Sequence, residues 1–561
     1  MKTSLVSQDF FLKNIKISLA SFTFLIHLNQ KKLNRFFYIF LFCMGWLNGQ
    51  NPSFPNNPED PKKIYIEKAD FFDVNQTEIP DAALLRGNII AKHDGAVLYC
   101  NTAYYFKKEN YIKCFGNVRL VQGDTITMTS EYGEYNGNNK LAYAQGNVVL
   151  TSPNSTLKTS LLHFDRATQE AYYRTGGTIY SGQNTLESIT GTYYTNAKMF
   201  NFQQKVQVFN GSATINTDFL DYYEVNGHAY VKGPSTIKDK DTFIYTEKGF
   251  YDTKLDVSDM DKNSYILYKD RRIEGDFIYY DKKRDFSKAT RNVKITDTVN
   301  NMIVTGHYGE MYQAKDSAII TKSALAKTLM ENDTLYIHAQ KMILSGKPES
   351  RVMRAYYNVR FYKSDMSGKC DSLYSDEKTS ITQLIGNPVL WNFKNQMTGD
   401  LMHLIHNKET EKLDSLKVFN NTFLVSKDTL GTGFNQVKGV FLNGRFEDNK
   451  LREVDVIKNT EIIYYLRNDN QEMIGINKSV CSKINMLVQG NTMEDITLMD
   501  QVEGEIYPED ELPENARKLR GFIWRQDERI QSVDDLMPEE EKAYDLKMKQ
   551  EAREEKEKTT P

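Results

Sequence analysis

Residues 116–150 decide the fold of this chain, and their sequence is GNVRLVQGDTITMTSEYGEYNGNNKLAYAQGNVVL. Val118 and Leu120 alternate with polar residues, and the alternation resumes at Ile126 and Met128. A period of two indicates β-strands, because successive side chains of a strand point to opposite faces of a sheet. The stretch therefore predicts strands with one apolar face and one polar face.

Turn residues separate these alternating segments. Gln122-Gly123-Asp124 and Asn136-Gly137-Asn138-Asn139 contain the residue types that accept positive φ where a chain reverses between strands. The same pattern recurs at Thr156-Leu157-Lys158-Thr159 and at Thr214-Ile215-Asn216-Thr217. Each unit is expected to supply a few short strands whose apolar face needs a neighbouring unit to cover it.

The units repeat at a fixed spacing. Their anchors are Gly87-Asn88, Gly116-Asn117, Gly146-Asn147 and Gly176-Gly177, whose first glycines are 29, 30 and 30 residues apart. Weaker copies lie at 205–206, 292–293, 358–359, 386–389 and 417–418. A fixed period of this size predicts a stacked architecture, which extends here from about residue 83 to 500.

The pattern divides the chain into five expected segments. They are a signal peptide at 1–50, whose true start we expect downstream of Met1, a linker at 51–82, a β-repeat domain at 83–250, more divergent β-repeats at 251–504, and a charged, helical or disordered tail at 505–561. The predicted fold class is all-β, with helix confined to the tail.

An apolar run near the N-terminus is typical of a secretory signal. Phe36 to Leu47 (FFYIFLFCMGWL) follows the basic residues Lys31, Lys32 and Arg35. The run holds about a dozen apolar residues, fewer than the roughly 20 that a membrane-spanning helix needs. A cleaved signal is favoured over a permanent anchor, although both stay open. The remaining chain is expected in the periplasm, either free or associated with the inner or the outer membrane.

The pattern of residues 116–150 resembles the OstA-like repeat of the OstA/LptA family of Gram-negative bacteria, most clearly over about residues 83–250. The resemblance implies an open, V-shaped β-roll (a β-jellyroll) whose apolar interior holds the acyl chains of lipid A during lipopolysaccharide transport. It also implies that other Lpt-type proteins, or further copies of this chain, join its ends by edge-to-edge strand pairing. This chain is much longer than the small bridging member of the family, which leaves its station in the pathway open.

An apolar interior suits such a ligand, because exposing one acyl chain of about a dozen carbons to water costs roughly 10 kcal/mol. The residues expected to line this groove alternate with polar neighbours in the repeats. They are Val118, Leu120, Ile126, Met128, Val148, Leu150, Leu157 and Ile215. The alternative is a structural or adhesive β-solenoid surface protein in which the same side chains form a closed core.

Enzymatic chemistry finds little support in the sequence. The formal net charge is −3, so no strong field points to nucleic acid. His403 and His406 lie three residues apart without the helical context of a zinc protease, and no phosphate loop or nucleophile motif is evident. We therefore expect neither a metal nor a cofactor, and a polysaccharide-active enzyme is the least favoured reading.

The cysteines of the expected mature chain leave the redox state open. They are Cys100, Cys114, Cys370 and Cys481. An oxidising compartment permits disulfides. If Cys100 and Cys114 flank a simple hairpin that turns at 107–110, they lie about three positions out of register, which disfavours a bridge.

The last 60 or so residues differ in character from the repeats. Residues 539–558 are dense in charge and rich in good helix formers. Before them lies a basic and aromatic segment at 518–525. Phe522, Trp524 and Arg525 are the candidates for docking, because tryptophan and arginine are enriched at binding hot spots.

Overall fold

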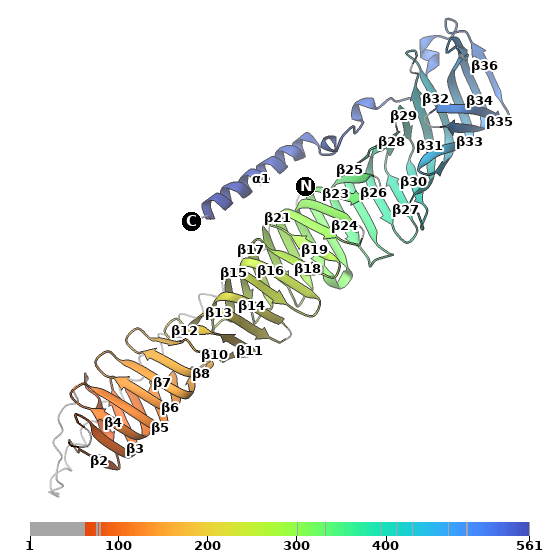
Figure 1. The fold of residues 1–561 in the computed structure, drawn as a ribbon. Coiled ribbons are helices and arrows are strands. Elements are labelled where there is room, and N and C mark those ends of the chain that lie inside the picture. The colour runs from red at the N-terminus through yellow and green to blue at the C-terminus, as the bar shows by residue number, and fades with distance from the viewer. Residues whose placement is uncertain are drawn as a thin grey trace, which may run out of the picture. The chain divides into compact units, whose positions relative to one another are not determined.

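A computed structural model describes residues 62–559, except 75–76, 78–79, 212, 300, 331–332, 393, 411, 429, 469 and 490–491. The expected signal peptide at 1–50 lies outside the described residues. The described chain forms 36 strands in one sheet whose neighbouring strands are antiparallel, and a single α-helix near the C-terminus (Figure 1). The predicted all-β class and the helical tail are confirmed.

The first twelve strands are β1 (Tyr65–Lys68), β2 (Phe71–Asp73), β3 (Ala83–His93), β4 (Ala96–Phe106), β5 (Tyr111–Gln122), β6 (Ile126–Asn136), β7 (Leu141–Thr151), β8 (Thr156–Asp165), β9 (Glu170–Tyr173), β10 (Gly177–Ser181), β11 (Asn184–Ser188) and β12 (Thr190–Tyr194). The next twelve are β13 (Met199–Asn210), β14 (Ala213–Tyr223), β15 (His228–Lys238), β16 (Thr242–Asp252), β17 (Val257–Lys262), β18 (Tyr265–Tyr268), β19 (Arg271–Glu274), β20 (Phe277–Asp281), β21 (Phe286–Asp297), β22 (Met302–Tyr312), β23 (Ser317–Leu329) and β24 (Thr334–Ser345). The last are β25 (Val352–Lys363), β26 (Met366–Asp376), β27 (Ile381–Ile385), β28 (Val389–Asn392), β29 (Asn395–Thr398), β30 (Leu401–His406), β31 (Leu413–Lys427), β32 (Phe434–Glu447), β33 (Lys450–Arg467), β34 (Met473–Gln489), β35 (Thr492–Met499) and β36 (Glu503–Tyr507), followed by helix α1 (Glu539–Thr559).

Most repeats are hairpins of two long strands, where a few short ones were expected. In the stretch that decides the fold, β5 has 12 residues and β6 has 11, and turns lie at 123–125 and 137–140 as predicted. Residues 65–68 and 71–73, within the expected linker, form strands β1 and β2 against β3.

The Gly-Asn anchors are bends inside strands, not turns between them. Gly116 (φ 72°) and Asn117 (φ 49°) lie in the middle of β5, where the register with β6 shifts between Phe115 and Val118. Two successive left-handed residues form a bulge that redirects the strand, and glycine and asparagine adopt this conformation at the lowest cost. The weaker copies bend in the same way with other residues, for example Gln204-Lys205, Arg291-Asn292 and Tyr357-Asn358.

The bends divide the sheet into two arms. Arm A holds the strand segments that end at turns such as 94–95 and 123–125, and arm B holds those that end at 107–110 and 137–140. In β9–β12, β17–β20 and β27–β30 the two arms of a strand are separate elements. The inward faces of both arms contribute to one apolar cluster that extends from Ile64 to Met486.

The C-terminal tail lies along the outer face of arm A. Gln436 donates a hydrogen bond of 2.8 Å from Nε2 to the carbonyl oxygen of Arg517, and Glu528 is paired with Lys369 at 2.7 Å. Helix α1 continues in the same direction, with Asp545 at 2.9 Å from Nε2 of His307 (Figure 1). The tail is therefore ordered against the sheet in its described part.

Candidate lipid-binding groove

The eight residues expected to line a groove all face inward and belong to the main apolar cluster. Seven lie on arm A of β5–β8 and Ile215 lies on β14; Leu120, Met128, Leu150 and Leu157 are successive cross-strand partners. The exposed fractions of all eight lie between 0 and 5 %. At these positions the interior is filled by the protein's own side chains, which differs from the open groove that the resemblance implied.

A row of tyrosines runs along the inward face of arm B, next to its turns. Its members are Tyr105, Tyr135, Tyr193, Tyr222, Tyr251 and Tyr280, all buried. Register pairs connect them through small or apolar residues, as in Tyr222 to Ala229 to Tyr251 to Ser258 to Tyr280. The last four recur every 29 residues, a spacing in the sequence that is enough to predict this row.

Polar contacts join the turns of arm A to arm B, and we call this line of contacts the seam. Arg166, in a turn of arm B, donates hydrogen bonds from Nη2 to the carbonyl oxygen of Asp94 at 2.8 Å and from Nε to Oε1 of Gln122 at 2.7 Å. Its Nη1 donates to the hydroxyl of Tyr135 at 2.7 Å. One guanidinium thus links two arm A turns to the tyrosine row.

Further contacts of the seam use tyrosine hydroxyls and side-chain amides. Nδ2 of Asn184 donates to the hydroxyl of Tyr222 at 3.0 Å, and this hydroxyl donates to Oγ of Ser181 at 3.1 Å. Ser155 donates from Oγ to Oε2 of Glu224 at 2.6 Å. Burial raises the pKa of Tyr280 to about 12 and also raises the pKa of Tyr193 and Tyr251.

A buried ionic cluster lies at the C-terminal end of the seam. Arg351 contacts the carboxylates of Asp270 and Asp297, and Nε of Arg271 is 3.5 Å from Asp297. Arg351, Asp297 and Arg271 are each less than a tenth exposed. Removal of Asp297 would leave the buried guanidinium of Arg271 without the carboxylate that it contacts, so this cluster is costly to open.

Beyond the tyrosines the row becomes apolar. Ser287 pairs with Met311, and the register continues through Ala318 to Leu344 and Met353. In this part of the molecule, inward-facing apolar side chains next to the turns of both arms are only partly buried. They include Leu335, Met353, Met366, Leu413, Phe446 and Leu451. We call these six residues the apolar rim.

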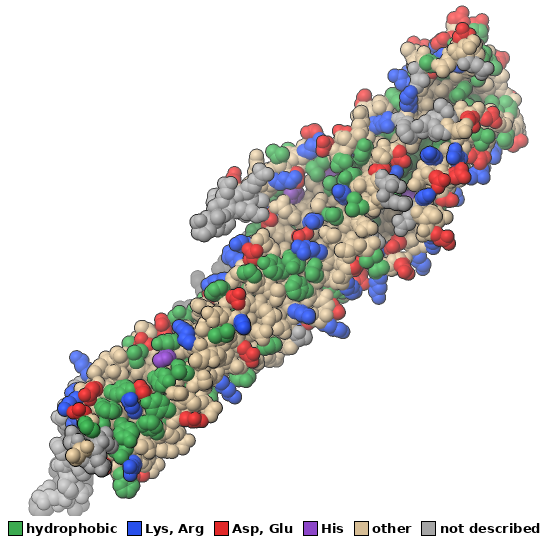
Figure 2. Space-filling view, viewed as in Figure 1, with side chains coloured by type: hydrophobic (Ala, Val, Ile, Leu, Met, Phe, Trp, Pro, Cys, Tyr) green, Lys and Arg blue, Asp and Glu red, His purple; other side chains and the backbone are tan. Residues whose placement is uncertain are grey.

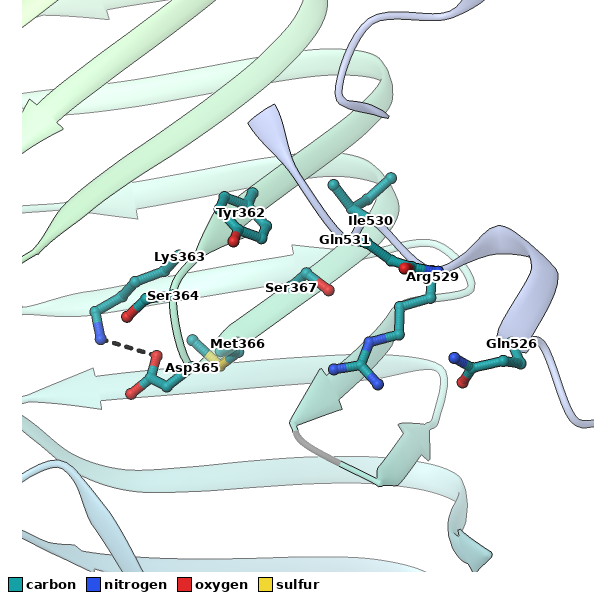
Figure 3. A pocket seen from close by; sticks show the side chains of 10 residues that line it. All are labelled: Tyr362, Lys363, Ser364, Asp365, Met366, Ser367, Gln526, Arg529, Ile530 and Gln531. Carbon is teal, nitrogen blue, oxygen red and sulfur yellow. Dashed lines mark hydrogen bonds and ion pairs between the residues drawn. The ribbon is translucent and has the colours of Figure 1, made fainter. Parts of the chain in front are cut away.

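A pocket of about 270 Å³ lies beside the rim, between the turn that joins β25 to β26 and the tail (Figure 3). Met366 lines it together with Lys363 and Asp365, whose charged groups are 2.9 Å apart. Arg529 extends from the tail toward the turn in Figure 3. The lining is mainly polar, so the pocket suits a polar group better than a hydrocarbon.

The three docking candidates contact the protein's own sheet. The rings of Phe522 and Trp524 lie 5.1 and 5.2 Å from the ring of Phe434, in a second apolar cluster on the outer face of arm A. The backbone nitrogen of Arg525 donates to Oε1 of Gln396 at 2.7 Å. The sequence indicated that these residue types form contacts, but it did not show that the contacts are with this chain's own sheet.

The residues considered for other chemistry are dispersed or packed. The four described cysteines are buried and form no disulfide with one another. The cross-strand partner of Cys114 is Ala103, which lies three positions along β4 from Cys100. His403 packs its ring 4.8 Å from the ring of Phe419. Within the described ranges, no group of three or more His, Cys, Asp or Glu side chains has metal-site geometry, and no helix is long and apolar enough to cross a membrane.

Acidic and basic side chains are interspersed on the face that Figure 2 shows, and hydrophobic side chains gather among them over β3–β6 and β16–β18. No single sign of charge dominates this face. This face therefore provides no broad electrostatic footprint for nucleic acid.

Comparisons with known proteins connect the repeats to a family. Residues 61–218 match the family described as OstA-like protein. The solved structure of LptH from Pseudomonas aeruginosa, described as the LptA homologous periplasmic component of the conserved lipopolysaccharide transport device, is 14 % identical, with a TM-score of 0.20 and coverage of 26 % of this chain and 99 % of that chain. No curated protein sequence matches. The matched residues 61–218 include the stretch that decides the fold, so this part of the chain is similar to the OstA-like family.

Proposed function

We propose that this protein binds lipopolysaccharide on the periplasmic side and shelters its lipid A acyl chains between the two arms, without enzymatic activity. The observation that carries the proposal is the continuous inward apolar face within an OstA-like chain, from Ile64 to Met486. A hydrocarbon gains about 0.8 kcal/mol per methylene when it leaves water, so a long apolar interior is the feature that such cargo requires.

Strand edges support partners of the same architecture. Among the described residues, β1 and β2 pair only with β3, and β35 and β36 pair only with β34. Apolar side chains are exposed beside both edges, with Phe71 71 % and Ile506 56 % exposed. Unpaired edges accept a further strand, so another Lpt-type protein or a second copy of this chain is the partner we propose at each end.

A structural or adhesive β-solenoid is the second candidate function. The observation that favours it is the burial of the eight expected groove residues, which fill the interior as an ordinary core does. In that case the apolar interior serves stability alone, and no lipid enters it.

Native purification separates the two functions. The protein is extracted from its own membranes under mild conditions, and the extract is analysed for lipid A by mass spectrometry. Co-purified lipid A at a fixed molar ratio supports transport. If no more lipid A co-purifies than with an unrelated periplasmic protein, the result supports the solenoid.

A further inference from the structure

We propose that acyl chains enter the protein along the apolar rim in its C-terminal part, and not at the N-terminal repeats that match the family. This inference rests on the proposed function and adds the place of entry. Leu335 and Met366 come from arm A, and Met353, Leu413 and Phe446 come from arm B. All five pack against the main cluster while remaining partly accessible to water.

The N-terminal part provides an internal comparison within one fold. Met353 belongs to the same row of cross-strand partners as the tyrosines. In the N-terminal part this row holds Tyr222 and Tyr251, whose side chains are 1 and 2 % exposed. Their hydroxyls bond to groups that include Asn184, on arm A. Opening the arms there would leave buried hydroxyl and amide groups without partners. The Arg351 cluster, two residues before Met353, holds the arms together where the rim begins. Beyond it the rim side chains are apolar, so parting them breaks no hydrogen bond of their own.

The chemistry of the rim selects a hydrocarbon over a peptide. Strand β25 pairs with β24 on one side and with β26 on the other, so the ladder behind the rim offers no free strand edge to an incoming backbone. A ligand between the arms must be held by apolar contact alone. Two of the five rim side chains named above are methionines, Met353 and Met366, whose flexible thioethers adapt to a chain that enters and leaves.

Photo-crosslinking in the purified full-length protein tests the place of entry. A photoreactive amino acid is placed at Met353 or Met366, at Tyr222 in the seam, and at Arg354, whose guanidinium lies over the ring of Tyr374 on the opposite face. The probe is lipopolysaccharide tritiated in its acyl chains. We expect at least ten-fold more label at the two methionines than at either comparison position.

The outcomes separate this inference from the proposed function. Equal or greater label at Tyr222 overturns entry at the rim and leaves lipid binding intact, whereas no label at any position overturns both. A double substitution, Met353→Asp with Met366→Asp, provides a second measurement, because water reaches these partly exposed side chains. It should lower captured lipid at least ten-fold without changing the thermal midpoint, and Tyr222→Phe should leave capture unchanged. Unchanged capture by a folded double variant would also overturn the inference.

Discussion

Arg166 donates a hydrogen bond from Nη2 to the carbonyl oxygen of Asp94, 72 residues earlier, at 2.8 Å. The donor lies in a turn of arm B and the acceptor lies in a turn of arm A. The two arms are thus held together by units that are far apart in the sequence. Closure of the N-terminal part depends on the correct stacking of several repeats at once.

The substitution Arg166→Ala should weaken this closure. It removes four hydrogen bonds, two of which are buried and reach the carbonyl oxygen of His93 and the hydroxyl of Tyr135. The expected cost is about 2 kcal/mol or more of the free energy of unfolding. Hydrogen exchange at the turns 94–95 and 123–125 should accelerate. The control is Arg119→Ala, which removes an exposed guanidinium over the ring of Tyr99; identical exchange in both variants contradicts a role for the seam.

Alkaline pH should open the tyrosine row. Burial raises the pKa of Tyr280 from 10.0 to about 12, so the folded state favours the neutral phenol. Because the folded pKa lies above the unfolded one, the stabilisation is fully present below pH 10 and is lost as the pH rises toward 12. Unfolding monitored by tyrosinate absorbance should therefore become easier across this window. Tyr280→Phe should reduce the slope of stability against pH, and an unchanged slope would show that this residue is not involved.

Met128→Asp should destabilise the fold, because Met128 is 3 % exposed and the new carboxylate lacks a partner. We expect a loss of about 3 kcal/mol in the free energy of unfolding, measured by denaturant titration. Thr127→Asp, on the opposite face of β6, is the matched control and should cost far less. A Met128→Asp protein of normal stability that has lost lipid would instead show that the interior at this position opens to water.

Removal of residues 508–561 should leave the stacked sheet folded, because each strand is stabilised mainly by its neighbours. The outer face of arm A would lose its cover over Phe423, Val425, Ile463 and Tyr465. We expect increased binding of a hydrophobic dye and a retained cooperative thermal transition. A shorter truncation of 539–561 keeps that cover and should bind little dye. Loss of the transition in the longer truncation would make the tail part of the core.

Several local features were predictable from residue type alone. The alternation at Val118, Leu120, Ile126 and Met128 predicted the inward face, and the turns at 123–125 and 137–140 lie where glycine and asparagine indicated them. That the Gly-Asn anchors bend strands and do not reverse the chain was not predictable, for a physical reason. A pair of left-handed residues serves equally well to reverse a chain or to bend a strand, and the residues themselves do not distinguish the two.

What the sequence by itself determined is therefore the strand period, the repeat length, the inward set of side chains and the helical tail. Only the tertiary structure decided that Arg166 reaches Asp94, that the tyrosine row is closed while the rim at Met353 remains partly exposed, and that Phe522 and Trp524 pack on Phe434. The conformational preferences of single residues act within one hairpin. The residues of that hairpin are therefore enough to predict an alternation of period two or a position with positive φ. Contacts between units that are 70 or more residues apart depend on the bends, twist and register accumulated over every strand between them, which no single unit encodes.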